Sequence, residues 1–316
     1  MVVTKQKQVI FDVDDNKIAA LIFGEGDKNI KHIEKLLGLR INARGNILCI
    51  TGENADKAKN IIESLIDSAK DKRIIDNDEV EAAIRLSENT NEIRNKNLFI
   101  KTPKKKIMPR SIQQEKYISA LKNKTLTFGI GPAGTGKTYI AVADAVEKIT
   151  SGLVDKIILS RPAVEAGEQL GFLPGDLKEK IDPYLRPLYD ALEDCLYSDK
   201  ISKLIDRGKI EIAPLAFMRG RTLASSYIIL DEAQNTSSMQ MKMFLTRLGK
   251  DSQMVITGDL SQIDLPEQKK SGLLDAISVT KKLKEIEHIH FSEKDVVRHP
   301  LVTKIVKSYN ERKEPR

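Results

Sequence analysis

A glycine-rich segment in the middle of the chain has the residue types and the spacing to bind phosphate. It fits the pattern G-x-x-x-x-G-K-[ST] and consists of Gly131, Pro132, Ala133, Gly134, Thr135, Gly136, Lys137 and Thr138. Glycines let backbone N–H groups wrap around an anion at the positive end of a helix dipole. We expect Lys137 to be a solvent-facing charge that contacts the β- and γ-phosphates of a nucleotide, and the Thr138 hydroxyl to hold Mg²⁺. A flexible glycine turn that precedes a lysine by chance is the alternative.

Two carboxylates after an apolar run are the next candidates for chemistry. Asp231 and Glu232 directly follow residues 227–230, which have the composition of a buried parallel strand. The carboxyl ends of such strands form the ligand-binding edge of an open α/β sheet. We expect Asp231 to hold magnesium through its water shell and Glu232 to accept a proton from the attacking water. A solvated acidic turn is the alternative.

Two glutamines are candidates to contact the nucleotide. Gln114 lies 17 residues ahead of Gly131, in a segment that Ser111 is expected to cap as a helix. Its amide offers a donor and an acceptor that match the N6 and N7 edge of adenine, so it points to ATP. Gln262 follows an apolar run over 253–257, where its amide could contact the γ-phosphate and distinguish ATP from ADP.

The segments around these residues predict how they are brought together. Apolar, strand-like runs precede the glycine loop, the acids and Gln262, and further such runs lie at 156–159 and 285–291. Residues 140–146 have helical composition, which gives strand, glycine loop and helix in succession. The sequence therefore predicts an α/β domain with a parallel sheet over residues 111–316.

The order of these motifs resembles the PhoH family of ATPases. The resemblance rests on Gln114, G-P-A-G-T-G-K-T, F-M-R-G-R-T-L at 217–223, D-E-A-Q-N at 231–235, G-D-L-S-Q-I-D-L-P at 258–266 and D-V-V-R-H-P-L-V at 295–302. It extends from residue 111 to about residue 310, and the core is similar to the first motor domain of superfamily-one helicases. It implies a RecA-like P-loop ATPase fold, ATP and Mg²⁺ as cofactors, and a role with RNA.

The resemblance also implies roles for arginines. Arg298 matches the helicase-like arginine that reaches the γ-phosphate, while Arg219 and Arg221 could pair with carboxylates, act at a subunit boundary or contact nucleic acid. Because only 18 residues follow Arg298, we expect no second motor domain to face the nucleotide. Related cores commonly form rings, so a homo-oligomeric ring, with a hexamer favoured, is expected. Arg298 would act there on its own chain's nucleotide or on a neighbour's.

The first 93 residues predict a small α+β domain. Its expected elements are strands over 7–13 and 17–23, a helix over 29–37, a hairpin around Gly45-Asn46 and a second helix capped by Asn54. The domain is similar to the KH type of RNA-binding module, in which a glycine loop opens a helix and clamps the nucleotide backbone. The loop departs from G-x-x-G, because the glycines are Gly24 and Gly26 and Asp27 stands where the second should fall. A packing or docking domain is the alternative.

Basic residues concentrate between the two domains. The net charge is +7, and seven basic residues and no acid lie within 94–110. Pro103 and Pro109 exclude a regular helix, so this stretch is predicted to be a linker. Its lysines are candidate contacts for nucleic-acid phosphates, with a solvated tether as the alternative. They are Lys101, Lys104, Lys105 and Lys106.

Composition limits the class of protein. No apolar run of 18 residues exists and the first residues lack a signal-peptide core, so a cytoplasmic protein is expected. Cys49 and Cys195 are expected to be buried free thiols. His288 and His290 alternate on one strand, but no third ligand lies nearby, so a metal site is not expected there.

Three functions remain open at this point. An ATPase that binds or remodels RNA fits the phosphate loop, the basic stretch and the KH-like domain. A nucleotide-gated docking or regulatory ATPase without translocation fits the same core. A P-loop kinase fits least, because it needs no carboxylate aimed at water.

Overall fold

The computed structural model of the chain divides into two compact units, Met1–Lys96 and Asn97–Arg316. It describes residues 7–70, 75–87, 98–162, 177–265 and 270–297, together with residues 302, 305 and 308. Within this described part, no helix is long and apolar enough to span a membrane.

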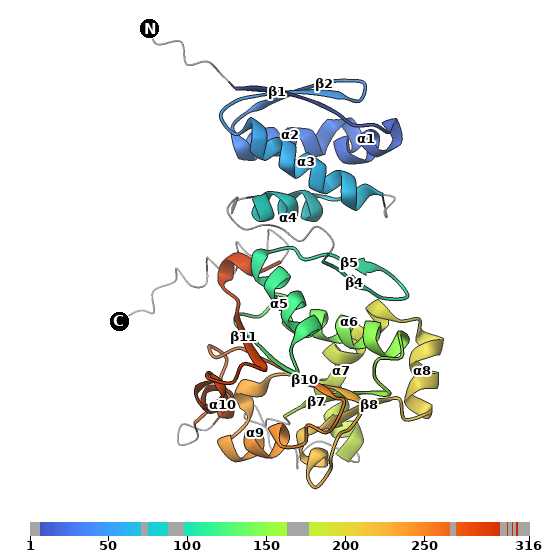
Figure 1. Cartoon of the computed structure of the whole chain (residues 1–316), viewed down its shortest axis with the longest axis vertical. Helices are drawn as coiled ribbons and strands as arrows, with labels where there is room; N and C mark the ends of the chain where they lie inside the picture. The colour runs from blue at the N-terminus through green and yellow to red at the C-terminus, as the bar shows by residue number, and fades with distance from the viewer. Residues whose placement is uncertain are drawn as a thin grey trace. The chain divides into compact units, whose positions relative to one another are not determined.

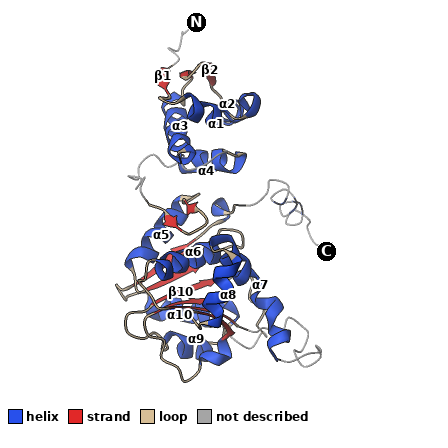
Figure 2. Cartoon of the chain, turned by 90° about the vertical axis from the view of Figure 1, so that its right-hand side faces the viewer, coloured by secondary structure: helices blue, strands red, loops and turns tan. Residues whose placement is uncertain are grey.

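The first unit is a three-stranded antiparallel sheet with its helices on one face (Figures 1 and 2). Strand β3 lies between the other two, and its inward residues Leu48 and Ile50 are fully buried against the helices. Ile10 and Ile47 on the opposite face are exposed. The elements are β1 (Gln8–Asp12), α1 (Asn16–Phe23), the 3₁₀ turn η1 (Glu25–Asp27), α2 (Lys28–Leu37), β2 (Arg40–Arg44), β3 (Ile47–Thr51), α3 (Ala55–Ala69) and α4 (Asn77–Ser87).

One expected strand is a helix. The prediction of a strand over 17–23 is wrong, because these residues belong to α1. The Asp15 carboxylate caps the helix by accepting a hydrogen bond from the Lys17 N–H at 2.7 Å. Ala19 and Ile22 are buried at helical spacing. Residues 18–23 are uniformly apolar and so show neither a helical nor a strand period, and the Asp15 cap favours the helix over the strand.

The second unit is built on a six-stranded parallel sheet with the order β11-β6-β10-β9-β7-β8. One strand, β10, separates the strand that precedes the glycine loop, β6, from the strand that precedes the acids, β9. This is a RecA-like P-loop arrangement. The strands are β6 (Leu126–Ile130), β7 (Lys156–Arg161), β8 (Ile210–Pro214), β9 (Ser226–Leu230), β10 (Gln253–Gly258) and β11 (Ile286–His290).

Helices cover both faces of this sheet. They are α5 (Ile112–Asn123), α6 (Lys137–Thr150), α7 (Leu177–Cys195), α8 (Ser198–Asp206), α9 (Ser238–Leu245) and α10 (Gly272–Thr280), with 3₁₀ turns η3 (Leu215–Met218), η4 (Ala233–Asn235) and η5 (Glu293–Asp295). Successive strand residues point to opposite faces. Tyr227 and Ile229 therefore pack with α5, α6 and α7, whereas Ile228 and Leu230 pack with α9 and α10 (Figure 2). Burial on both faces explains why these strands are uniformly apolar.

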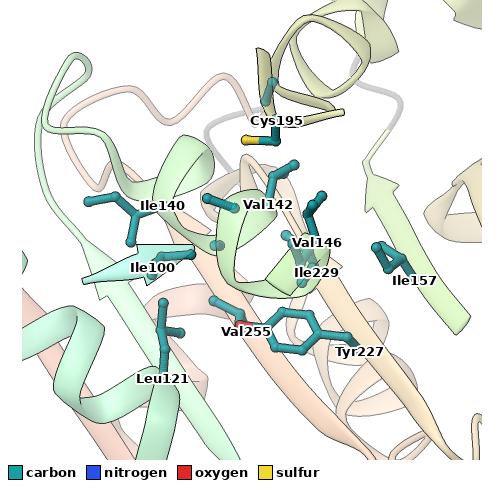
Figure 3. Close-up of a cluster of buried hydrophobic side chains, with 14 of the residues drawn as sticks. Ile100, Leu121, Ile140, Val142, Val146, Ile157, Cys195, Tyr227, Ile229 and Val255 are labelled. Carbon is teal, nitrogen blue, oxygen red and sulfur yellow. The ribbon is translucent and has the colours of Figure 1, made fainter. Parts of the chain in front are cut away.

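The basic stretch differs from the linker predicted over 94–110. From residue 98 it belongs to the second unit, where β4 (Ile100–Lys101) and β5 (Lys106–Ile107) form an antiparallel hairpin, which we call the basic hairpin. Ile100 is fully buried beside α6, near Ile140 and Leu121 (Figure 3). The Lys101 N–H also donates to the Glu147 carboxylate at 2.6 Å. Lysines and prolines dominate the sequence of this segment, so the few apolar residues that anchor it to the second unit, such as Ile100, did not predict an ordered hairpin.

Two smaller expectations also change. Asn54 precedes α3, but its side chain donates to the Leu37 carbonyl rather than capping the helix. Cys195 is buried and free as expected, whereas the free thiol of Cys49 is only partly buried. Burial raises the pKa of Cys195 to about 11, so its thiol stays protonated at neutral pH.

Candidate functional site

The candidate residues gather at the carboxyl edge of the six-stranded sheet. In the parallel register, Gly258 pairs with Ile130, and Leu230 pairs with both Ile256 and Ser160. These strands therefore end at nearly the same level. Gly131, Asp231 and Asp259, which follow three of them, and Arg161, the last residue of β7, meet at one edge. This is the edge at which open α/β sheets bind ligands.

The glycine loop between β6 and α6 requires its glycines. Gly134 and Gly136 have φ angles of 83° and 80°, which favour glycine, and Gly136 caps α6. A Cβ atom on Gly131 would lie 2.5 Å from the carbonyl oxygen of Phe291, the residue that follows β11. The loop thus turns tightly and places backbone N–H groups at the start of α6, as an anion site needs.

Lys137 is not the solvent-facing charge that the sequence suggested. Its residue is only 8% exposed, and Nζ donates to the carbonyl oxygens of Gly131 and Pro132, both at 2.7 Å. The ammonium group of Lys137 therefore lies inside the glycine loop, in the space that a phosphate would enter. A nucleotide would exchange these carbonyl contacts for phosphate oxygens.

Asp231 joins the glycine loop to two strands. Its Oδ1 accepts hydrogen bonds from the Thr138 hydroxyl at 2.6 Å and from the Thr257 hydroxyl at 2.7 Å. Hydroxyl and carboxylate oxygens are the hard donors that Mg²⁺ prefers, and Mg²⁺ usually keeps several waters. These residues therefore fit a magnesium ion carried by a nucleotide. In the described ranges, no group of three or more His, Cys, Asp and Glu side chains could hold a metal ion.

Glu232 is held from two sides. Its backbone is left-handed, with φ 53°, which is uncommon for a residue with a side chain. Oε1 lies 3.0 Å from Nη2 of Arg161 at the end of β7. Oε2 accepts a hydrogen bond from Nε2 of Gln234 at 2.5 Å.

Gln234 connects Glu232 to the loop after β10. Its Nε2 also donates to the Gln262 carbonyl at 3.1 Å, and its Oε1 accepts from the Asp259 N–H at 3.0 Å. Gln234 is 1% exposed, whereas Gln262 is exposed. The backbone carbonyl of Gln262, the expected sensor, is therefore linked to Glu232 by way of the Gln234 amide.

Gln114 lies against the glycine loop. Its Nε2 donates to the Thr135 carbonyl at 3.0 Å, and its Oε1 accepts from the Arg110 N–H at 2.7 Å. Ser111 caps α5 as expected, because its hydroxyl accepts from the Gln114 N–H. Each end of the amide already has one partner, so an adenine would have to share or replace these hydrogen bonds.

Comparison with known proteins places the chain in a family. The family model described as PhoH-like protein matches residues 106–310. The PhoH-like protein of Bacillus subtilis is 50% identical over 299 residues, which cover 92% of this chain and 94% of that protein. The chain belongs to the PhoH family.

More distant proteins also match. The PhoH-like protein of Mycobacterium tuberculosis is 46% identical over 96% of this chain and 88% of its own. Protein PhoH of Escherichia coli is 43% identical over 65% of this chain and 58% of its own. The solved structure of the Pif1 helicase of Candida albicans matches 57% of this chain and 38% of its own length. Its sequence identity is 12% and its TM-score is 0.30, so no argument about function is drawn from it.

The arginines of this PhoH family member fall into different environments. Arg221 makes two hydrogen bonds to Glu211, at 2.5 and 2.7 Å, and this pairing lowers the pKa of Glu211. Arg219 is exposed. Arg298 lies outside the described residues. The residue before it, Val297, donates its N–H to the Gly134 carbonyl at 2.9 Å, so the chain leads into Arg298 from beside its own glycine loop.

The lysines of the basic hairpin already contact the protein. Lys105 pairs with Asp194, whose pKa is lowered by this hydrogen bond, and Lys104 donates to the Glu193 carbonyl at 2.5 Å. Lys106 lies 4.2 Å from the Phe99 ring centroid, and Lys101 is exposed. A phosphate that bound Lys105 would have to compete with Asp194.

The two histidines of β11 have different surroundings. The His288 ring stacks on Phe128 and lies 2.9 Å from the Thr280 hydroxyl, and burial lowers its pKa. His290 is exposed. This arrangement gives His288 a packing role.

Sequence reasoning missed three residues of the site: Arg161, Gln234 and Thr257. Each is polar. Arg161 and Thr257 stand at or next to the last residue of a strand, and Gln234 lies in η4, in the loop that follows β9. That position was a usable signal, since polar side chains at the carboxyl edge of a parallel sheet are commonly ligand-facing. The pairing of Arg161 with Glu232, which are far apart in the chain, was not readable from the sequence.

Proposed function

We propose that this PhoH family member is a Mg²⁺-dependent ATPase that acts on or with RNA. The observation that carries the ATPase proposal is the contact of Asp231 with Thr138, which joins the two acids to the glycine loop. When bound, Mg²⁺ would neutralise charge on the β- and γ-phosphates. Thr138 and Asp231 would hold it, and the loop N–H groups and Lys137 would surround the phosphates.

Hydrolysis then needs a base and an oriented water. Glu232 follows Asp231 directly and would take a proton from the water that attacks the γ-phosphorus, with ADP as the leaving group. Gln234 would hold the Glu232 carboxylate in place, because it bonds both to Glu232 and to the loop of Gln262. Gln262 would respond to the presence of the γ-phosphate.

Two features support RNA as the partner. The basic hairpin carries four lysines, Lys101, Lys104, Lys105 and Lys106, and a phosphate backbone favours such a cluster. In the first unit, the turn Glu25–Asp27 opens α2, where a KH module would place its glycine loop. Glu25 and Asp27 would repel phosphate, and they are the specific feature that favours the docking alternative.

The test is ATP turnover by the full chain with and without single-stranded RNA or DNA. The proposal expects phosphate release that RNA increases. Turnover that neither nucleic acid changes would favour a nucleotide-gated docking ATPase, and transfer of the phosphoryl group to an acceptor other than water would identify a kinase.

Neutralising the basic hairpin should weaken RNA binding. Replacing Lys104, Lys105 and Lys106 together by glutamine should reduce the slope of log affinity against log salt by up to roughly 2, at ~0.7 for each phosphate contact of a single strand. The slope is measured from binding titrations at several salt concentrations. The matched control replaces Lys281, Lys282 and Lys284, which are exposed elsewhere on the same unit. Equal slopes for the parent and the hairpin variant would make the hairpin a structural element only.

We further propose that the chain works as a closed homo-oligomeric ring, with a hexamer as the expected size, and that Arg298 acts on the nucleotide of its own subunit. The hydrogen bond from Val297 to Gly134 supports the proposal for Arg298.

An equimolar mixture of Lys137→Ala and Arg298→Ala subunits should then show no more turnover than the two variants show separately. Recovered activity in proven mixed assemblies would show action across the interface, and a monomeric mass in solution would contradict the ring.

A further inference from the structure

Arg161 is the feature of the site that the proposed function does not use. It ends β7, and its guanidinium group has two partners on different elements. Nη2 lies 3.0 Å from Oε1 of Glu232, and Nη1 donates to the Tyr184 carbonyl of α7 at 2.8 Å. A planar guanidinium can bridge two acceptors in this way because its donors diverge in a fixed fork. Arg161 therefore ties the expected base to the main chain of α7.

The two contacts of Glu232 differ in how easily they can change. Gln234 is buried and has partners at both ends of its amide, so moving it would leave buried polar atoms unpaired. The side chains of Arg161 and Glu232 are 20% and 31% exposed, so water can replace the contact between them at a small cost. Gln234 is thus the fixed support of the carboxylate, and Arg161 is the partner that can leave.

We propose that Arg161 is a positioning residue that restrains Glu232 in the resting protein through their ion pair. A carboxylate oxygen whose lone pair faces a guanidinium group is less available to accept a proton from water. When the ion pair opens, the Glu232 carboxylate can turn to the water, while the hydrogen bond from Gln234 keeps it in the site. This inference rests on the proposed ATPase function.

The same contact could instead hold Glu232 in its working orientation. The two possibilities predict opposite signs. If Arg161 restrains the base, its removal raises kcat, whereas if Arg161 orients the base for catalysis, its removal lowers kcat. Neither requires a change in KM for ATP, because the glycine loop that contacts the phosphates is untouched.

The experiment measures steady-state ATP turnover of the full chain without nucleic acid. We expect Arg161→Ala to raise kcat roughly 3- to 5-fold, the factor that an ion pair of this exposure can account for, with KM unchanged. Arg161→Lys keeps the charge but loses the fork, so it should raise kcat by less. The matched control is Arg186→Ala, because Arg186 also lies in the second unit, on α7, and pairs only with Asp190 among the described ion pairs. It should leave kcat as in the parent.

A double variant shows whether the effect runs through the base. Arg161→Ala combined with Glu232→Gln should be as slow as Glu232→Gln alone. A lower or unchanged kcat in both Arg161 variants, with thermal unfolding like that of the parent, would overturn the proposal while leaving the ATPase function in place. Full turnover by Glu232→Gln would instead refute the assignment of the base, whatever Arg161 does.

Discussion

Lys137→Ala should lower ATP turnover by at least about 100-fold, the loss expected when a charged donor to a transferring phosphate is removed. Nζ of Lys137 lies inside the glycine loop, bonded to the carbonyls of Gly131 and Pro132. Without it, these carbonyls face the bound phosphates with no positive charge between them. ATP binding should therefore weaken as well, which is measured by titration with a fluorescent ATP analogue.

The control for this variant is Lys156→Ala. Lys156 is an exposed lysine at the first residue of β7, at the amino edge of the same sheet. It should bind and hydrolyse ATP as the parent does. Turnover of Lys137→Ala near the parent rate, in a chain with the parent's thermal unfolding, would contradict the assignment of the glycine loop.

Glu232→Gln should separate nucleotide binding from chemistry. Glutamine has nearly the same size but is no base at neutral pH, so hydrolysis should slow by roughly 10²- to 10⁴-fold. ATP binding should remain within a factor of two or so of the parent, because Lys137, Thr138 and Asp231 are unchanged. A glutamine offers one oxygen where Arg161 and Gln234 both donate, so one of these two contacts is lost. The measurement pairs single-turnover hydrolysis with a binding titration.

Glu211→Gln is the matched control for this substitution. Glu211 is also a partly buried carboxylate paired with an arginine, Arg221, but it lies on β8, the edge strand of the sheet. Its replacement should cost some stability and leave turnover unchanged. Slow hydrolysis in both variants would mean that the effect comes from weakening the sheet rather than from loss of a base.

Local signals made much of the second unit predictable. The glycine loop, the acids after β9 and the run before Gln262 are each recognisable within ten residues, and parallel strands that are buried on both faces leave uniform apolar runs. The carboxyl edge of the sheet then follows from topology. The start of α5, with Gln114 in its first turn, also followed from a local signal, the Ser111 cap.

What could not be predicted depends on contacts between distant residues. The basic hairpin is ordered by a few apolar side chains, such as Ile100, against α6, and its charge gave no sign of this. The segment 17–23 is helical, with a cap at Asp15, although its apolar run shows no period of its own. Loop geometry sets the contacts of Lys137 with the carbonyls of its own loop and the contacts of Glu232 with Arg161 and Gln234. The spacing of residues in the sequence does not predict this geometry.

Transfer of the γ-phosphate of ATP to water is measured by turnover in water labelled with heavy oxygen, followed by mass spectrometry of the released phosphate. If this PhoH family member is the proposed Mg²⁺-dependent ATPase, phosphate appears in step with ADP, each phosphate carries labelled oxygen from the solvent, and its formation requires Mg²⁺. Unlabelled phosphate, a phosphorylated acceptor in place of free phosphate, or undiminished turnover without Mg²⁺ would contradict the proposal.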